Sequence, residues 1–254
     1  IIGGLIHQGH PASQIEVVEP WAEAREALRK NYGIEAQAEA GPALQRAQIV
    51  VWAVKPQTFR DAAAQAKAHT QGALHLSVAA GIRSDSIAQW LGTERIVRTM
   101  PNTPALVGKG MSALYARPAV SAPERQSIEA IMATTGEFLW VDSEPQLDAV
   151  TALSGSGPAY VFYFLEAMTR AGTGMGLTEQ QAHQLAVGTF VGASELARRS
   201  DDPPSVLRQR VTSKGGTTYA ALQSMEAAGV AASFEAAMRA AQHRAHELGD
   251  EFGA

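Results

Sequence analysis

The first half of the sequence alternates short apolar runs with segments of helical spacing. The apolar runs have the length of buried strands and span 15–18, 49–54, 73–78, 95–99, 111–115 and 138–141. Helical periodicity between them covers 21–32, 59–68, 84–91 and 121–135. Parallel strands need crossovers of about a dozen residues, which these segments supply. The alternation therefore predicts βαβ units and a mostly parallel α/β sheet.

The second half is expected to be all helical, because no convincing strand pattern follows about Asp142. Helical segments are predicted at 144–153, 158–170, 178–199, 203–211, 217–228 and 234–248. The run 160–165 is apolar on more than one helix face, which requires burial, and so small a domain has little interior. We therefore expect two domains, 1–143 and 144–254, with a partner subunit covering the second.

Polar residues mark the starts of several helices. Ser84 is a candidate N-cap, and 121–124 and 178–181 match capping boxes. The pair Gly3-Gly4 does not fit a G-x-G-x-x-G turn, and it is expected to let the first helix pack closely on a strand.

Composition narrows the classes of function. The 254 residues include no Cys, which excludes disulfides, thiolate nucleophiles and Cys-based metal sites. Lys and Arg number 21 against 25 Asp and Glu, so no basic excess points to nucleic acid or an anionic membrane. The seven His residues form no cluster of ligand-like spacing, and no membrane span or signal peptide is visible. We expect a soluble cytoplasmic protein without a bound metal.

Ligands of parallel sheets bind at the carboxyl ends of the strands. Glu19, Lys55, Gly81 and Asn102 are predicted to lie there. In dinucleotide folds, an acid at the position of Glu19 follows the Gly-rich turn by ~20 residues and bonds the adenosine ribose. That count runs off the front of this sequence, so the turn is expected to be absent from it. Glu19 is otherwise a solvated acid at a strand end.

Two polar loops of the second half could bind anions. The segment 154–158 places hydroxyls and bare backbone before a helix, although it also suits a plain N-cap. The segment 212–218 combines two glycines with Ser213, Thr217 and Thr218, which favours an anion-binding nest at a helix start. Its alternative is a Gly-Gly hinge between helices.

Longer strings run through the sequence in a fixed order. They are Ala53-Val54-Lys55-Pro56, then 98–104 with 107–110, then 154–160, then Ala171-Gly172 with Gly176-Leu177, and finally Leu207-Arg208 with 211–218. They cover nearly the whole chain, and the strings at 154–160 and 213–218 are highly specific. In order and spacing they resemble the pyrroline-5-carboxylate reductase family, which performs the last step of proline biosynthesis.

The resemblance implies a Rossmann-type doubly wound sheet that binds NADPH or NADH. It also implies an all-α C-terminal domain, here 144–254, that dimerises and binds substrate, with dimers often assembled into a ring. The family's first strand and Gly-rich turn are missing from this sequence. Cofactor contacts are implied for Ala53, Val54, Lys55, Pro56, Ala79, Ala80, Gly81, Asn102 and Thr103, in addition to Glu19.

The resemblance also places the substrate. The carboxylate of 1-pyrroline-5-carboxylate is expected on Ser213, Gly215, Gly216, Thr217 and Thr218. Thr218 is expected close to the ring nitrogen, where its hydroxyl would orient the imine rather than act as a strong acid. Hydride transfer to a protonated C=N bond needs few side chains beyond those that position the reactants.

Three departures and two alternatives qualify the resemblance. Lys214 stands where the family loop commonly has Pro, and Ala40 stands where many members have Asn near the ribose. Glu19 would repel a 2′-phosphate and favour NADH, although Arg25 could compensate. One alternative is another imine reductase or a β-hydroxyacid-type dehydrogenase, but 144–171 lacks the Lys that such dehydrogenases need. The other is a catalytically inert helical dimer.

Overall fold

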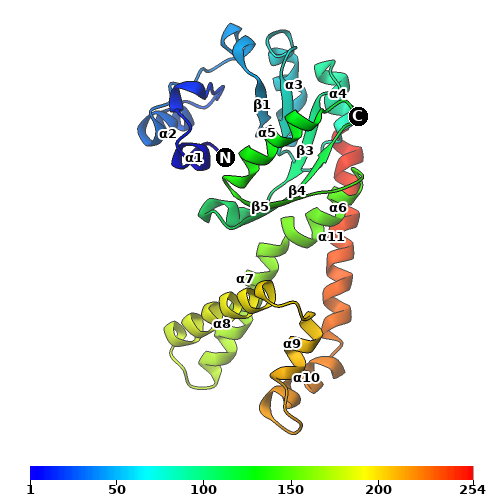
Figure 1. Cartoon of the computed structure of the whole chain (residues 1–254). Helices are drawn as coiled ribbons and strands as arrows, with labels where there is room; N and C mark the ends of the chain where they lie inside the picture. The colour runs from blue at the N-terminus through cyan, green and yellow to red at the C-terminus, as the bar shows by residue number, and fades with distance from the viewer. Residues whose placement is uncertain (254) are drawn as a thin grey trace. The chain divides into compact units, whose positions relative to one another are not determined.

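The computed structural model describes residues 1–253 and divides into two compact units (Figure 1). The first unit comprises Ile1–Ser156 together with the chain from Ala240 onward. The second comprises Gly157–Arg239. One long helix, α11 (Val230–Phe252), contributes to both units.

A five-stranded sheet in the order β1-β2-β3-β4-β5 forms the centre of the first unit. The strands are β1 (Ile49–Trp52), β2 (Leu74–Ser77), β3 (Ile96–Met100), β4 (Gly110–Ala116) and β5 (Gly136–Trp140). All neighbours are parallel except β3 and β4. The predicted mostly parallel sheet is therefore confirmed.

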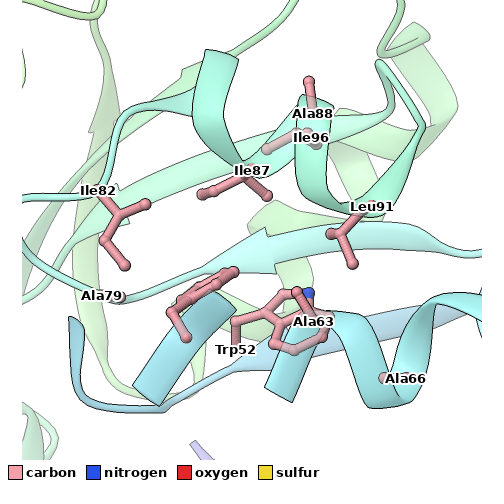
Figure 2. Packing of buried hydrophobic residues seen from close by; sticks show 10 residues of the cluster. Trp52, Ala63, Ala66, Ala79, Ile82, Ile87, Ala88, Leu91 and Ile96 are labelled. Carbon is pink, nitrogen blue, oxygen red and sulfur yellow. The ribbon is translucent and has the colours of Figure 1, made fainter. Parts of the chain in front are cut away.

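Helices cover both faces of this sheet. On one face, α3 (Pro56–Ala66) and α4 (Ser84–Leu91) bury Phe59 and Ile87 against Trp52 and Ile96. Figure 2 shows Ile87, Trp52 and Ile96 in this cluster. On the other face, α5 (Ala122–Ala133) buries Ile128 among residues of β2, β3 and β4. Each fully buried side chain of this size contributes about 1.5–3 kcal/mol. The two cores make the unit doubly wound, as expected.

The segment before β1 agrees with its prediction in part: the helix predicted at 21–32 is present, but the strand predicted at 15–18 is not. It contains α1 (Ile2–His7), η1 (Ala12–Gln14), α2 (Ala22–Tyr32) and η2 (Pro42–Arg46). The predicted strand 15–18 is wrong, because only Val18 pairs, in an isolated parallel bridge to Gln37. A strand forms only where neighbouring backbone satisfies its hydrogen-bonding groups, and the five-stranded sheet does not include this segment.

Two expected local features also change in detail. Gly4 packs on the end of α5 rather than on a strand, since an added Cβ would lie 2.5 Å from the carbonyl oxygen of Thr134. Ser84 is not the N-cap of α4, because Arg83 holds that position and Ser84 binds Glu144 instead. The capping boxes at Ser121 and Thr178 are confirmed.

Helices and helical turns make up the rest of the described chain, with no strand after β5. They are η3 (Lys67–His69), η4 (Thr103–Val107), α6 (Gln146–Val150), the π-helical turn η5 (Thr151–Gly155), α7 (Gly157–Gly174), α8 (Glu179–Arg199), α9 (Pro204–Arg210) and α10 (Thr217–Ala227). Within the second unit, Phe234 packs edge-on against Tyr160 and Phe164, whereas Phe162 and Tyr163 are exposed. None of the helices in residues 1–253 has the length and apolar character needed to cross a bilayer.

Candidate functional site

Three of the predicted cofactor segments meet at one edge of the sheet. Ala53–Pro56 follows β1, Ala79–Gly81 follows β2, and Asn102–Thr103 follows β3. The first two are neighbours, because Trp52 pairs with Ser77 and the Val78 N–H donates to the Trp52 carbonyl at 3.1 Å. The edge is the carboxyl end of parallel strands, where α/β sheets bind ligands.

The turn after β1 passes directly into helix α3. Lys55 is the N-cap residue in extended conformation, and Pro56 is the first helical residue. Thr58 donates from its N–H and its hydroxyl to the Lys55 carbonyl, at 3.0 Å and 3.1 Å. Ala53 and Lys55 are exposed, so the turn offers accessible backbone beside a cation at a helix start.

The turn after β2 is built from small residues. The Ala79 N–H donates to the Ser77 hydroxyl at 3.3 Å, and Gly81 has a φ of +74°, which glycine adopts without strain. Ala80 is exposed. Ala53 and Ala80 have short, exposed side chains, which leave the backbone of both turns accessible to a flat ring such as that of a nicotinamide dinucleotide.

Asn102 uses its side chain within the protein. Its amide group donates to the Ser154 carbonyl at 3.2 Å, and its carbonyl oxygen accepts from the Met111 N–H at 2.9 Å. An added Cβ on Gly155 would lie 2.5 Å from Cε of Met100, so Ser154 and Gly155 pack closely on the end of β3. Asn102 therefore links the end of β3 to β4 and to this polar segment. The sequence alone did not predict this linking role.

Glu19 lies apart from these three turns, beside the isolated bridge. Its carboxylate accepts from the Trp21 N–H at 2.9 Å, next to the start of α2. Arg25 donates to the Glu19 and Pro20 carbonyls, at 2.8 Å and 2.7 Å. An acid and a guanidinium therefore stand at the same bend of the chain, each bound to nearby backbone.

The predicted substrate loop joins α9 to α10 in the second unit. Gly215 has a φ of +76°, and Gly216 is the N-cap of α10. An added Cβ on Gly216 would lie 2.6 Å from the Ser213 hydroxyl oxygen, so only glycine at this position leaves room for the Ser213 side chain. Within residues 1–253, the hydroxyls of Ser213, Thr217 and Thr218 engage no protein partner, and the first N–H groups of α10 point out of the helix. The loop can bind a small anion.

A hollow of about 430 Å³ lies beside this loop. Its lining includes Arg208 and Lys214, with Tyr219, Gln223 and Glu226 on the side of α10. The Gln223 amide donates to the Tyr219 hydroxyl at 2.8 Å, which orders that side. Arg208 and Lys214 outnumber the one acid of this lining, Glu226, so the net charge beside the loop is positive and favours an anionic ligand.

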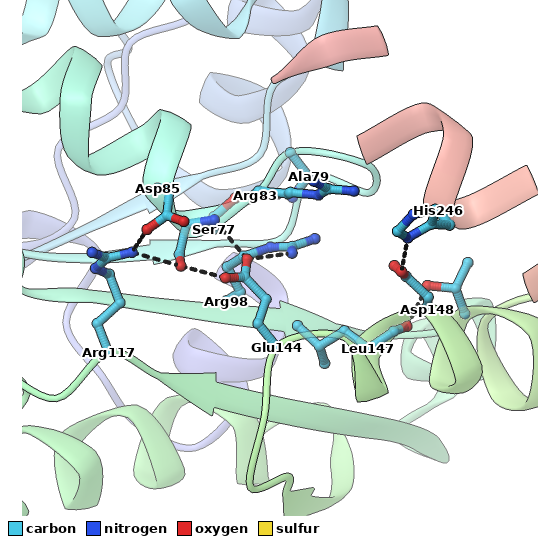
Figure 3. A network of polar contacts seen from close by, with 12 residues as sticks. Ser77, Ala79, Arg83, Asp85, Arg98, Arg117, Glu144, Leu147, Asp148 and His246 are labelled. Atoms are coloured by element: carbon cyan, nitrogen blue, oxygen red, sulfur yellow. Dashed lines mark hydrogen bonds and ion pairs between the residues drawn. The ribbon is translucent and has the colours of Figure 1, made fainter. Parts of the chain in front are cut away.

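A buried charge network supports the turn region of the first unit (Figure 3). The Glu144 carboxylate accepts from the Ser84 N–H at 2.6 Å, the Ser84 hydroxyl at 2.5 Å and the Arg98 guanidinium at 2.6 Å. The Arg98 side chain is only 9% exposed. Arg117 donates to the Ser84 hydroxyl at 3.1 Å. The network fixes the start of α4 and the connection into α6 on strand β3.

Fold and site together define an NAD(P)-dependent oxidoreductase with a helical second unit. Two family models match the chain: "NADP oxidoreductase coenzyme F420-dependent" over residues 1–81, and "Pyrroline-5-carboxylate reductase dimerisation" over residues 144–248. The second match shows a domain type that forms homo-oligomers.

Individual relatives identify the family more narrowly. The pyrroline-5-carboxylate reductase of Pseudomonas aeruginosa is 44% identical over 100% of this chain and 93% of its own length. The Haemophilus influenzae enzyme is 38% identical over 98% of this chain and 92% of its own length. The chain belongs to the pyrroline-5-carboxylate reductase family.

Solved structures agree with this assignment. A pyrroline-5-carboxylate reductase from Coxiella burnetii superposes with a TM-score of 0.90 at 35% identity, covering 97% of this chain and 93% of the other. The Plasmodium falciparum pyrroline carboxylate reductase, solved with NADP bound, gives 0.80 at 29% identity, covering 86% and 84%. The doubly wound domain followed by helices is therefore the fold of this family.

Proposed function

We propose that the chain reduces the C=N bond of 1-pyrroline-5-carboxylate to L-proline with NADPH or NADH. The observation that carries this proposal is the loop 213–218, which presents unpartnered hydroxyls and helix N–H groups to a small carboxylate. Family membership supplies the reaction, and the turns after β1 and β2 supply a fitting place for the dinucleotide.

Each part of the chain has a distinct task in this reaction. When bound, the dinucleotide supplies a hydride from C4 of its nicotinamide to the imine carbon. Ala53–Pro56, Ala79–Gly81 and Asn102–Thr103 hold it, and Glu19 contacts the adenosine ribose. Ser213 and the backbone of 215–218 hold the substrate carboxylate by charge-assisted hydrogen bonds.

Thr218 is proposed to hydrogen-bond the ring nitrogen of the substrate. A hydroxyl can accept from a protonated imine and donate to the amine product, so it serves both ends of the reaction. The protonated imine needs no further acid, and catalysis consists of bringing donor and acceptor together.

The assay follows imine-dependent loss of NADPH or NADH absorbance. Thr218→Ala is expected to lower kcat/KM about tenfold, since one lost hydrogen bond costs about 1–1.5 kcal/mol. Thr218→Ser keeps the hydroxyl and should retain activity, and the exposed Thr173→Ala is a control outside the loop. Unchanged kinetics in Thr218→Ala would remove the proposed role.

A different outcome would reject the substrate itself. A folded protein that binds NADPH but oxidises none of it with 1-pyrroline-5-carboxylate would act on another imine or a carbonyl compound. The proposal also keeps two expectations from the sequence, namely a cytoplasmic location and assembly of homodimers into a ring. Light scattering of the purified protein measures the assembly.

A further inference from the structure

The last turns of helix α11 lie against the turn that follows strand β2. An added Cβ on Gly81 would lie 3.0 Å from Cβ of Leu248 and 3.5 Å from Cδ2 of Phe252. Gly81 is therefore restricted twice, by its positive φ and by the helix beside it. Both segments belong to the first compact unit, although they lie far apart in the sequence.

Several contacts hold this helix end in place. Arg83 pairs with Asp250 at 2.7 Å, and an added Cβ on Gly249 would lie 2.9 Å from Nε of Arg83. The Ser86 hydroxyl donates to the Gly253 carbonyl at 2.9 Å. Figure 3 shows Arg83 beside Ala79, and His246 of the helix facing Asp148. The helix end is thus anchored to the residues that follow the turn.

Apolar packing completes the anchor. Phe252 packs against the buried cluster that contains Ile82 and Ile87. Ile82 follows Gly81 directly and is fully buried, with 0% of its surface exposed. The side chain of Phe252 therefore contacts the same core that fixes the end of the turn.

The turn has little hydrogen bonding of its own. Within residues 1–253, the N–H groups of Ala80 and Gly81 make no backbone hydrogen bond, and the Ala79 N–H makes only the 3.3 Å contact to Ser77. A turn held by few close hydrogen bonds depends on the groups packed against it. At Gly81 those groups include Leu248 and Phe252.

We propose that Leu248 and Phe252 are positioning residues for the turn Ala79–Gly81. By filling the space behind Gly81, they hold the turn in the conformation that receives NAD(P)H. This inference rests on the cofactor role proposed above for the turn. It assigns to the last turns of the chain a task in a site that lies more than half the sequence away.

The test measures cofactor and substrate kinetics separately. Leu248→Ala and Phe252→Ala should each raise the KM for NADPH about tenfold, which corresponds to losing about 1.4 kcal/mol of binding free energy when the turn is no longer held in place. The KM for 1-pyrroline-5-carboxylate should stay unchanged, which general destabilisation would not produce. Phe252→Leu should restore most of the affinity. Glu251→Gln changes an exposed residue of the same helical turn and serves as the matched control.

A direct change in the turn separates the possible failures. Ala80→Leu places bulk where the cofactor is proposed to bind. If Ala80→Leu weakens NADPH binding but the folded Leu248 and Phe252 variants do not, the positioning role is overturned and the cofactor role stands. If Ala80→Leu also leaves NADPH binding unchanged, the cofactor role of the turn fails.

Folding of each variant is checked by thermal unfolding. Should Phe252→Ala fail to fold, Leu248→Ala and the milder Leu248→Val carry the same comparison. Direct binding of NADPH, measured by titration of each folded variant, is then the readout. Weaker NADPH binding with an unchanged KM for the imine supports the inference, and unchanged NADPH binding overturns it.

Discussion

His75 gives the protein a built-in sensitivity to acid. This histidine of β2 is 1% exposed, and its Nδ1 accepts a hydrogen bond from the Trp52 indole at 3.0 Å. Burial lowers the pKa of His75 from 6.5 to about 4, and the nearby charge of Arg95 acts in the same direction. The folded protein therefore keeps the ring neutral at a pH where an unfolded chain would protonate it.

The magnitude follows from this difference in pKa. Because the unfolded chain binds the proton first, the contribution of His75 to stability is complete above about pH 6.5 and falls as the pH drops toward 4. At about 1.4 kcal/mol per pKa unit, the full difference corresponds to about 3 kcal/mol. About 2 kcal/mol of this is lost between pH 7 and pH 5.

Urea unfolding at the two pH values, followed by circular dichroism at a fixed protomer concentration, measures this loss. His75→Gln can still accept from Trp52 but does not titrate, so its free energy of unfolding should fall by about 2 kcal/mol less than that of the wild type. His10→Gln removes an exposed histidine and should behave as the wild type. Equal losses in the wild type and His75→Gln would refute the reasoning.

Three further changes test the site and its support. Gly216→Ala should raise the KM for the imine several-fold but not that for NADPH, because its Cβ would displace Ser213; steady-state kinetics with each substrate varied measures both. Glu144→Ala should lower the free energy of unfolding in urea by about 3 kcal/mol, since it leaves the buried Arg98 unpaired. Arg25→Ala should raise the KM for NADPH about fivefold and leave that for NADH unchanged; equal effects on both cofactors would contradict a 2′-phosphate contact.

Local patterns predicted most of the fold. The apolar runs from residue 49 onward all became strands, and the capping boxes at Ser121 and Thr178 marked true helix starts, because these signals act within one turn of the chain. The run 15–18 failed because strand formation depends on a neighbour, which a local pattern does not report. Ser84 failed for a similar reason, since its partner Glu144 lies sixty residues further along.

The loops of the candidate site could be predicted, because their residue types are a local signal. Two glycines with hydroxyls before a helix indicated the loop 213–218, and strand ends indicated the turns after β1 and β2. The support of those turns was not predictable. Gly81 contacts Leu248, and Asn102 donates a hydrogen bond to Ser154. Both contacts join segments that are far apart in the sequence, and the periodicity of a sequence does not show which distant segments lie close together.

The anchored end of α11 also sets the order in which the chain can complete its structure. The first unit combines residues 1–156 with the chain from 240 onward, so the second unit interrupts it as an insertion. A ribosome releases the whole sheet long before it releases Leu248 and Phe252. During that interval the apolar surface that will receive Phe252 is open to solvent, and closing it requires a loop that spans the entire helical unit. The first unit is therefore completed only after the helical unit has been synthesised, even though its strands are made first.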